Sequence, residues 1–276
     1  MPYKTLLAHL DLDETDDGRA RLAADLAKRF GAALIGVSGW APSPSFSGDT
    51  AVIETPPEVV DLEVMEDLLK TRGDAFREIA TRGGVEAEWR SALALPTELV
   101  VQEAGGADLL IVGATHHPVL RDPYRMVDPG AVLLRAGRPI LLVPPAVASL
   151  SGKRIAIAWK DTREARRAVS DALPFLEQAD SVAVVEFGDD ADPSAAEHGQ
   201  ADLLNFLARH GVRGTGARTM AIAGTVGESL FRLIRDEAVD LIVAGGYGHS
   251  RLGEAVFGGL TRDLLTGSPV CCLLSH

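Results

Sequence analysis

The stretch LIVAGGYGHSRLGEAVFGGLT, residues 241–261, decides the fold class of this chain. It begins with a short, continuous apolar run, and glycine follows at positions 245, 246 and 248. Continuous Val, Ile and Leu runs are typical of parallel strands that are buried on both faces. Ligands bind beyond the carboxyl ends of such strands. The stretch therefore predicts a buried parallel strand that ends in a glycine-rich ligand loop.

The chain contains two copies of this pattern. DLLIVG at residues 108–113 and DLIVAG at residues 240–245 stand at the same place in each copy, and KTLLAHL (4–10) and KRIAIAW (153–159) open the two copies. In both halves, short Val/Ile/Leu runs alternate with segments of helical period. This alternation predicts an α/β fold with two tandem, open, mostly parallel five-stranded sheets and helices on both faces of each sheet.

Proline-rich, polar and helix-capping segments predict how the chain is divided into domains, helices and loops. PPAVASLSG (144–152) predicts the boundary between a first domain, residues 1–146, and a second domain, residues 152–276. Thr225 and Glu228 have the spacing of a capping box and predict a helix start. The polar or proline-rich stretches 42–57 and 188–199 are interpreted as solvated loops, of which the longer could act as a lid.

Composition excludes several classes of partner. The chain has 276 residues, of which 46% are hydrophobic, and 27 basic against 39 acidic residues give a formal charge of −12. This charge repels nucleic acid and anionic membrane surfaces, and no uncharged run reaches the ~18 residues that span a bilayer. Cys271 and Cys272 are interpreted as two buried thiols on opposite faces of a strand. We expect a cytoplasmic protein.

The glycines of the quoted stretch have a spacing that suits a phosphate chain. Two residues separate Gly245 from Gly248, nine separate Gly248 from Gly258, and a helical segment follows Gly259. Glycine permits close approach of the backbone, and a helix start offers unpaired N–H groups. A P-loop is absent, Arg251 breaks a dinucleotide fingerprint, and Leu252 breaks a nucleophile elbow.

With this spacing, the sequence resembles the nucleotide-binding branch of the universal stress protein family, as a tandem member. The resemblance implies strand order 3-2-1-4-5 in each half, with ATP or a related adenine nucleotide, with or without Mg, at the ends of the first and fourth strands. It also implies an internal pseudo-dimer joined through the last strands, residues 139–143 and 269–274, and leaves a further homodimer open. The implied nucleotide-binding residues are Ala158, Lys160, Ala244, Gly245, Tyr247, Gly248, His249, Gly258, Gly259, Leu260 and Thr261.

Two positions of the second half depart from the family pattern. Gly259 stands where the family has Ser or Thr, so one hydrogen-bond donor to phosphate is lost, and Thr261 either replaces it or caps the helix. Lys160 stands where the family usually has aspartate, with Asp161 beside it, and a lysine can pair with phosphate instead. Trp159 either stacks on the purine or packs in the core.

The first half carries a weaker form of the motif. In GATHHPVLRDPYRMVDPGAVLL, residues 113–134, His116 replaces the second glycine, and Asp122 and Asp128 lie near the expected phosphate site. Three prolines, at 118, 123 and 129, remove N–H donors. His116 and His117 predict a metal only with a third ligand nearby. Although Asp11 fits the acidic position of the family, we expect this half to be structural or to bind something else.

The resemblance and the glycine spacing together lead to two functional hypotheses. The first is a nucleotide-binding regulator of the stress response, with an adenine nucleotide in the second half and an unknown protein partner. The alternative is an interaction or chaperone-like stress module that binds no nucleotide. A flavin- or dinucleotide-dependent electron carrier is disfavoured because its fingerprints are absent. No residue stands out as a base that positions water, so an enzyme is not predicted beyond weak ATP hydrolysis.

Overall fold

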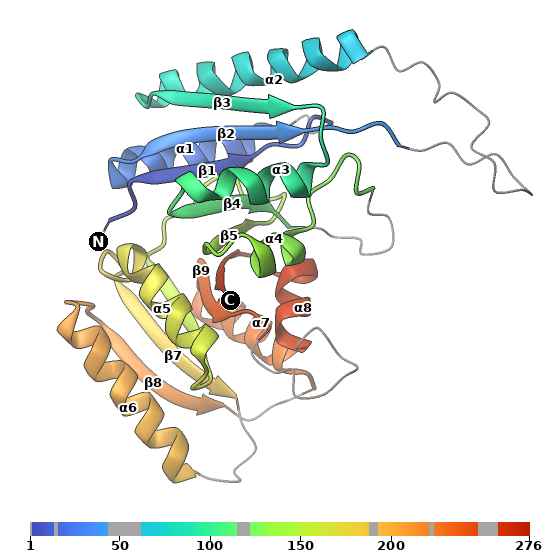
Figure 1. Cartoon of the computed structure of the whole chain (residues 1–276). Coiled ribbons are helices and arrows are strands. Elements are labelled where there is room, and N and C mark those ends of the chain that lie inside the picture. The colour runs from blue at the N-terminus through green and yellow to red at the C-terminus, as the bar shows by residue number, and fades with distance from the viewer. Residues whose placement is uncertain are drawn as a thin grey trace, which may run out of the picture.

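The computed structural model describes residues 2–13, 16–43, 62–114, 122–187, 193–220, 224–247 and 259–276. Its elements alternate between strand and helix along the chain (Figure 1). The first half consists of β1 (Thr5–His9), α1 (Gly18–Phe30), β2 (Ala33–Gly39), α2 (Leu62–Gly83), β3 (Ala87–Ala92), α3 (Pro96–Glu103), the 3₁₀ turn η1 (Ala104–Gly106), β4 (Leu109–Gly113), α4 (Pro129–Arg135) and β5 (Ile140–Val143).

The second half repeats this order. It consists of β6 (Arg154–Trp159), α5 (Arg163–Leu176), β7 (Ser181–Phe187), α6 (Pro193–Arg209), β8 (Thr215–Met220), α7 (Val226–Glu237), β9 (Leu241–Gly245), α8 (Gly259–Gly267) and β10 (Cys271–Ser275). The stretch 188–199, interpreted from the sequence as a solvated loop, is therefore helical from Pro193 onward. Proline is favoured in the first turn of a helix because its φ is already helical and its missing N–H has no partner there.

The strands form one continuous sheet, with order β3-β2-β1-β4-β5-β10-β9-β6-β7-β8. Each half has the predicted order 3-2-1-4-5. The two predicted five-stranded sheets are joined edge to edge, because β5 and β10 pair antiparallel, with Leu142 opposite Cys272. This pairing, which the family resemblance implied, satisfies the backbone groups of two strands that would otherwise be exposed sheet edges.

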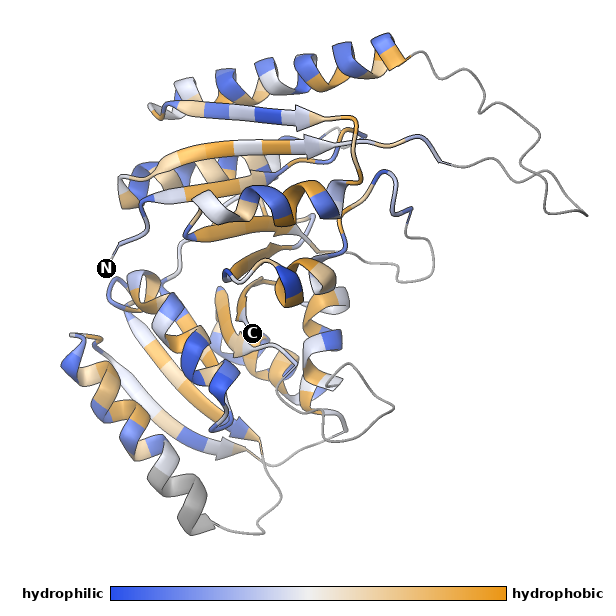
Figure 2. Ribbon diagram, viewed as in Figure 1, coloured by the Kyte–Doolittle hydropathy of each residue, from blue (hydrophilic) through white to orange (hydrophobic). Residues whose placement is uncertain are grey.

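Helices cover both faces of the sheet (Figure 2). One apolar cluster is buried on each face. One cluster contains residues of α1, α2, α5 and α6, and the other contains residues of α3, α4, α7 and α8. The neighbouring cysteines fall in different clusters, Cys271 in the first and Cys272 in the second. Both are buried free thiols on opposite faces, as the alternation of side chains along a strand predicts.

The predicted start of α7 is confirmed at atomic level. The backbone N–H of Glu228 donates to Thr225 Oγ1 at 3.1 Å, and the backbone N–H of Thr225 donates to Glu228 Oε2 at 2.9 Å. These reciprocal bonds form the capping box and fix the first turn of the helix. No helix in the described part of the chain is both long and apolar enough to cross a bilayer.

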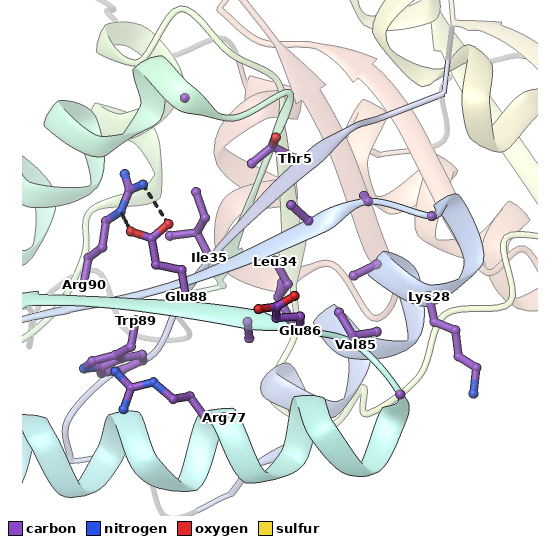
Figure 3. Close-up of a pocket in the computed structure, with 17 residues that line it drawn as sticks. Thr5, Lys28, Leu34, Ile35, Arg77, Val85, Glu86, Glu88, Trp89 and Arg90 are labelled. Atoms are coloured by element: carbon purple, nitrogen blue, oxygen red, sulfur yellow. Dashed lines mark hydrogen bonds and ion pairs between the residues drawn. The ribbon is translucent and has the colours of Figure 1, made fainter.

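A broad hollow of about 1010 Å³ lies at the amino ends of the first three strands, which begin at Thr5, Ala33 and Ala87. Its lining side chains lie on both sides of β3: Glu88 and Arg90 on one side, Trp89 on the other (Figure 3). This arrangement encloses no single concave site. It also lies at the opposite end of the strands from the ligand position expected for a parallel sheet.

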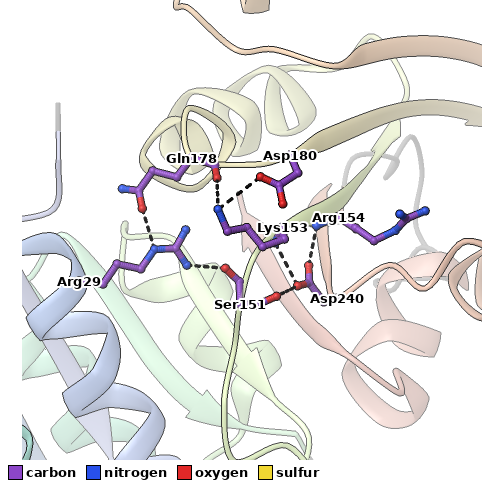
Figure 4. Close-up of polar contacts among 7 residues, drawn as sticks. All are labelled: Arg29, Ser151, Lys153, Arg154, Gln178, Asp180 and Asp240. Carbon is purple, nitrogen blue, oxygen red and sulfur yellow. Dashed lines mark hydrogen bonds and ion pairs between the residues drawn. The ribbon is translucent and has the colours of Figure 1, made fainter.

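The amino ends also carry the clearest atomic evidence of the internal repeat. Asp240, which precedes β9, accepts hydrogen bonds from the backbone N–H groups of Lys153 and Arg154 at 3.0 and 3.1 Å (Figure 4). Asp108, which precedes β4, accepts from the backbone N–H groups of Lys4 and Thr5 at 2.7 and 3.0 Å. The two aspartates of the repeated DLLIVG and DLIVAG motifs thus fix the first strand of each half beside the fourth.

The segment that joins the halves is held by α1. Arg29 donates from Nη1 to the carbonyl oxygen of Ser151 and from Nε to Gln178 Oε1, both at 2.7 Å (Figure 4). The Phe30 ring meets the Phe175 ring edge-on, with centroids 5.0 Å apart. The two halves therefore share packed side chains as well as a sheet.

Candidate functional site

The candidate site lies at the carboxyl ends of β6 and β9, which are adjacent parallel strands. Ala158 and Ala244 are paired in register near these ends. The chain continues outward from β6 to β7 on one side of this pair, whereas β10 lies on the other side of β9. The strand order therefore reverses between β6 and β9, and such a reversal is where open parallel sheets leave a crevice for a ligand.

A pocket of about 230 Å³ is present at this position. Its lining residues come from β6, β7, β9 and the starts of α5, α7 and α8: Ala158, Trp159, Lys160, Thr162, Ala165, Phe187, Val226, Gly245, Gly259, Leu260 and Thr261. Most of the residues implied by the family resemblance are thus brought together, although they are separated by up to a hundred positions in the chain. Gly248, His249 and Gly258 lie outside the described residues.

Three helix N-termini converge on this pocket. Thr162 is the N-cap of α5 and accepts from the backbone N–H of Ala165 at 3.2 Å. Val226 is the first residue of α7, and Gly259 is the first residue of α8. A helix N-terminus carries roughly half a positive charge, and the Lys160 side chain at the pocket is exposed and basic. The pocket is therefore suited to an anion.

Two acidic groups lie at the contact between α7 and α8. Asp263 of α8 lies against Gly227 of α7. Burial raises the pKa of the Asp263 carboxyl, Arg262 lowers it, and Glu228 raises it again. Because neither Asp263 nor Glu228 lines the pocket, Lys160 is the charged side chain among its described lining residues.

The two glycines of the pocket have different roles. A Cβ on Gly245 would lie 2.5 Å from the backbone nitrogen of Ala165, so β9 and α5 approach each other too closely for any side chain there. A Cβ on Gly259 would have no heavy atom of the described residues within 4 Å. Close packing thus requires glycine at 245, whereas the described residues leave space beside Gly259 at the start of α8.

Tyr247 is turned away from the pocket toward the first half. Its φ is +59°, its ring is buried, and its hydroxyl lies 2.5 Å from the position of a Cβ on Gly130 of α4. Its backbone N–H donates to Thr261 Oγ1 at 3.1 Å. The Thr261 hydroxyl therefore holds the loop after β9 against α8. Ala244, also among the residues implied by the resemblance, is buried within the strand.

Sequence and structure comparisons identify the fold family. The model of the universal stress protein family matches residues 2–143, about half of the chain. The chain belongs to the universal stress protein family. No curated protein matched the sequence.

Solved structures support the same fold over the whole chain. A universal stress protein from Archaeoglobus fulgidus superposes with a TM-score of 0.73 at 14% identity and covers 98% of this chain and 95% of its own. A putative universal stress protein from Pseudomonas aeruginosa gives 0.61 at 14% identity, covering 99% and 93%. The cytoplasmic domain of a prokaryotic cation chloride cotransporter gives 0.51 at 11% identity, covering 98% and 94%. At these identities the likeness extends to the fold alone.

In the first half of this universal stress protein, a side chain occupies the corresponding space. Arg19 of α1 donates from Nη1 to the carbonyl oxygen of His9 at 2.8 Å and to Asp11 Oδ2 at 3.1 Å. Its guanidinium lies directly over Gly113, at the end of β4, where a Cβ would clash with it. Asp11, the acidic residue that fits the family pattern, is therefore engaged by the protein's own arginine.

His9, whose carbonyl oxygen accepts the hydrogen bond from Arg19, is almost completely buried. Neither ring nitrogen has a hydrogen-bond partner among the described residues, and Asp11 Oδ1 is 3.8 Å from Nδ1. Burial lowers the pKa of His9 to about 4, against the opposing attraction of Asp11. Sequence reasoning missed both His9 and Arg19. The signal that could have indicated this contact is Arg19, a charged residue in the first turn of α1. It follows Asp11, just after the end of β1, by a few residues.

The other first-half candidates have local roles where the structure describes them. Asp128 is the N-cap of α4 and accepts from the backbone N–H of Gly130 at 2.9 Å. Asp122 accepts from the backbone N–H of Tyr124 at 2.9 Å, as in an Asx turn. His116 and His117 lie outside the described residues.

Proposed function

We propose that this universal stress protein binds an adenine nucleotide in the second-half pocket and acts as a nucleotide-responsive regulator of the stress response. The observation that carries the proposal is the convergence of the N-termini of α5, α7 and α8 on a pocket beside Lys160. Phosphate groups are stabilised at helix N-termini by unpaired N–H groups and by the helix dipole.

The pocket offers both polar and apolar groups. Gly259 and Lys160 lie where we place the phosphates, and Phe187 and Leu260 add apolar surface. Its volume of about 230 Å³ is below the range of ~300–1,000 Å³ for pockets that enclose a drug-sized ligand. We therefore assign it to the phosphates and the ribose rather than to a whole nucleotide.

The loop that follows β9 offers a route for the ligand to act on the rest of the molecule. A Cβ on Gly246 would lie 2.5 Å from Leu133 Cδ2 of α4, and the Tyr247 hydroxyl lies against Gly130 of the same helix. A nucleotide that displaces this loop must therefore also move, or strain, the contact with the first half. A nucleotide bound in the second half would thus change how the two halves pack against each other.

Calorimetric titration of the full chain with ATP, ADP, AMP and cyclic AMP, with and without Mg²⁺, tests the proposal. The variant Gly259→Asp places a carboxylate at the start of α8, where the dipole favours it for folding but where it repels phosphate. We expect binding to the native chain and its loss in this variant. Gly106→Asp, an equal charge change at an open position of η1, should bind as the native chain does.

Two results would contradict the proposal. The absence of heat with all four nucleotides at millimolar concentration would favour an interaction or chaperone-like role instead. Equal affinity of Gly259→Asp and the native chain would place the phosphates elsewhere. Mass spectrometry of the native protein, which detects any nucleotide that co-purifies, provides an independent measurement.

A further inference from the structure

A second pocket lies between α5 and α6, and Trp159 is the residue that lines both this pocket and the candidate nucleotide pocket. Its volume is about 380 Å³, within the range of small-molecule sites. Its lining residues are Trp159, Asp161, Arg166, Val169, Ser170, Gly199, Asp202, Leu203 and Phe206. Apart from Trp159, none of these residues lines the candidate nucleotide pocket.

A buried donor faces this pocket. Trp159 is only 6% exposed, and its Nε1–H has no hydrogen-bond partner among the described residues. A Cβ built on Gly199 of α6 would lie 3.8 Å from Nε1, so the indole nitrogen lies beside α6. A buried N–H without an acceptor is unfavourable, and an acceptor placed in this pocket would relieve that cost.

The pocket exists because α6 stands away from α5. In the first half, α1 and α2 pack directly against each other, and Arg72 of α2 bonds Asp17 at the start of α1 at 2.6 Å. In the second half, α6 is held instead over β7 and β8, where Gln200 Nε2 donates to Glu186 Oε2 at 2.9 Å and to Thr219 Oγ1 at 3.1 Å. The glycine at 199 leaves the adjoining helix surface without a side chain.

The lining residues define the chemistry of an occupant. Trp159 and Phe206 provide aromatic walls, and Val169 and Leu203 add aliphatic surface. At the rim, Asp161 is paired with Arg166 at 2.7 Å, and Asp202 adds a negative charge. An anionic ligand is therefore repelled, whereas a neutral or cationic aromatic molecule is accepted.

We propose that the pocket between α5 and α6 is a binding site for a compact, neutral or cationic aromatic molecule whose carbonyl-type acceptor bonds Trp159 Nε1–H. The inference does not depend on the proposed nucleotide function. It rests on the cavity, the unsatisfied indole donor and the acidic rim.

Benzamide is a suitable probe, because it joins an aromatic ring to a neutral carbonyl acceptor. The chain has three tryptophans, so ¹H–¹⁵N NMR of the full-length protein should show three indole signals, and Trp159→Phe assigns that of Trp159. We expect benzamide to shift this signal saturably in the millimolar range, as suits a small ligand. Benzoate, which has the same shape but carries a negative charge, should bind at least about tenfold more weakly.

Gly199→Leu fills the pocket with a side chain that also favours the helix, so the variant should fold. We expect it to abolish the benzamide shift, whereas Gly105→Leu, at an open position of η1, should keep it. Gly259→Asp should also keep it, which separates this test from that of the nucleotide site. The proposal is overturned if the Trp159 signal shows no saturable shift, if Gly199→Leu leaves the shift intact, or if benzoate binds equally well.

Discussion

Gly36 of β2 and Trp89 of β3 are paired in parallel register, and a Cβ on Gly36 would lie 2.6 Å from Trp89 Cε3. At the equivalent register of the second half, Val184 is paired with Ala217. The larger side chain of the pair thus lies on β3 in the first half and on β7 in the second. Trp89 also lies against α2, so this difference in side-chain size accompanies the different packing of α2 and α6.

The Gly36–Trp89 contact predicts that even one added methyl group is harmful. Gly36→Ala should lower the free energy of unfolding by about 1–3 kcal/mol, because the new Cβ overlaps the indole and the Phe76 ring. Urea denaturation measures the change, and Gly105→Ala, at an open position, is the control. An equal stability of the two variants would mean that the indole moves aside without cost.

The open space at Gly259 predicts a gain of function. Gly259→Ser supplies a hydroxyl at the start of α8, where family members have Ser or Thr, and a hydrogen bond to a charged phosphate contributes roughly 1.5–3 kcal/mol. ATP should therefore bind roughly 10- to 150-fold more tightly than to the native chain. Calorimetry measures the ratio, with Gly259→Ala as the variant that adds a side chain without a donor. Equal tightening by alanine would exclude the hydrogen bond as the cause.

Burial of His9 predicts a pH-dependent stability. Its pKa is about 4 in the folded chain and about 6.5 when unfolded, so the unfolded state binds more protons between these values. The stabilising effect of the neutral ring is fully present above about pH 6.5 and is lost as the pH falls toward 4. The loss is on the order of 3 kcal/mol.

Unfolding free energies of the native chain and of His9→Gln, measured between about pH 7 and 4, check this prediction. The difference between the two should change with pH in the stated direction. Parallel curves for the native chain and His9→Gln would show that His9 titrates normally.

The two cysteines should be chemically inert in the folded protein. Burial raises the pKa of Cys272 to about 12 and that of Cys271 further, so the reactive thiolate is scarcely populated. A disulfide reagent such as Ellman's should react with neither thiol in buffer and with both in concentrated urea. Rapid labelling of the folded chain would reveal an opening of β10 that its full burial argues against.

The sequence by itself predicted most features that depend on local pattern, although the helical start of α6 at Pro193 was interpreted as a loop. Continuous apolar runs such as residues 241–244 predicted buried parallel strands, and the repeat predicted two α/β halves, whose strand order 3-2-1-4-5 was implied by the family resemblance. Thr225 and Glu228 predicted the start of α7, and adjacency placed Cys271 and Cys272 on opposite faces. These features follow from backbone periodicity and short-range hydrogen bonding, which a linear sequence displays directly.

Only the tertiary structure decided what fills each space at the ends of the strands. Arg19 lies over Gly113 at the end of β4 in the first half, whereas a pocket lies at the ends of β6 and β9 in the second. Tyr247 follows a glycine-rich strand end, yet it packs on α4 of the other half. These outcomes depend on the volumes and charges of side chains that folding brings together from distant parts of the chain, and no local pattern records them.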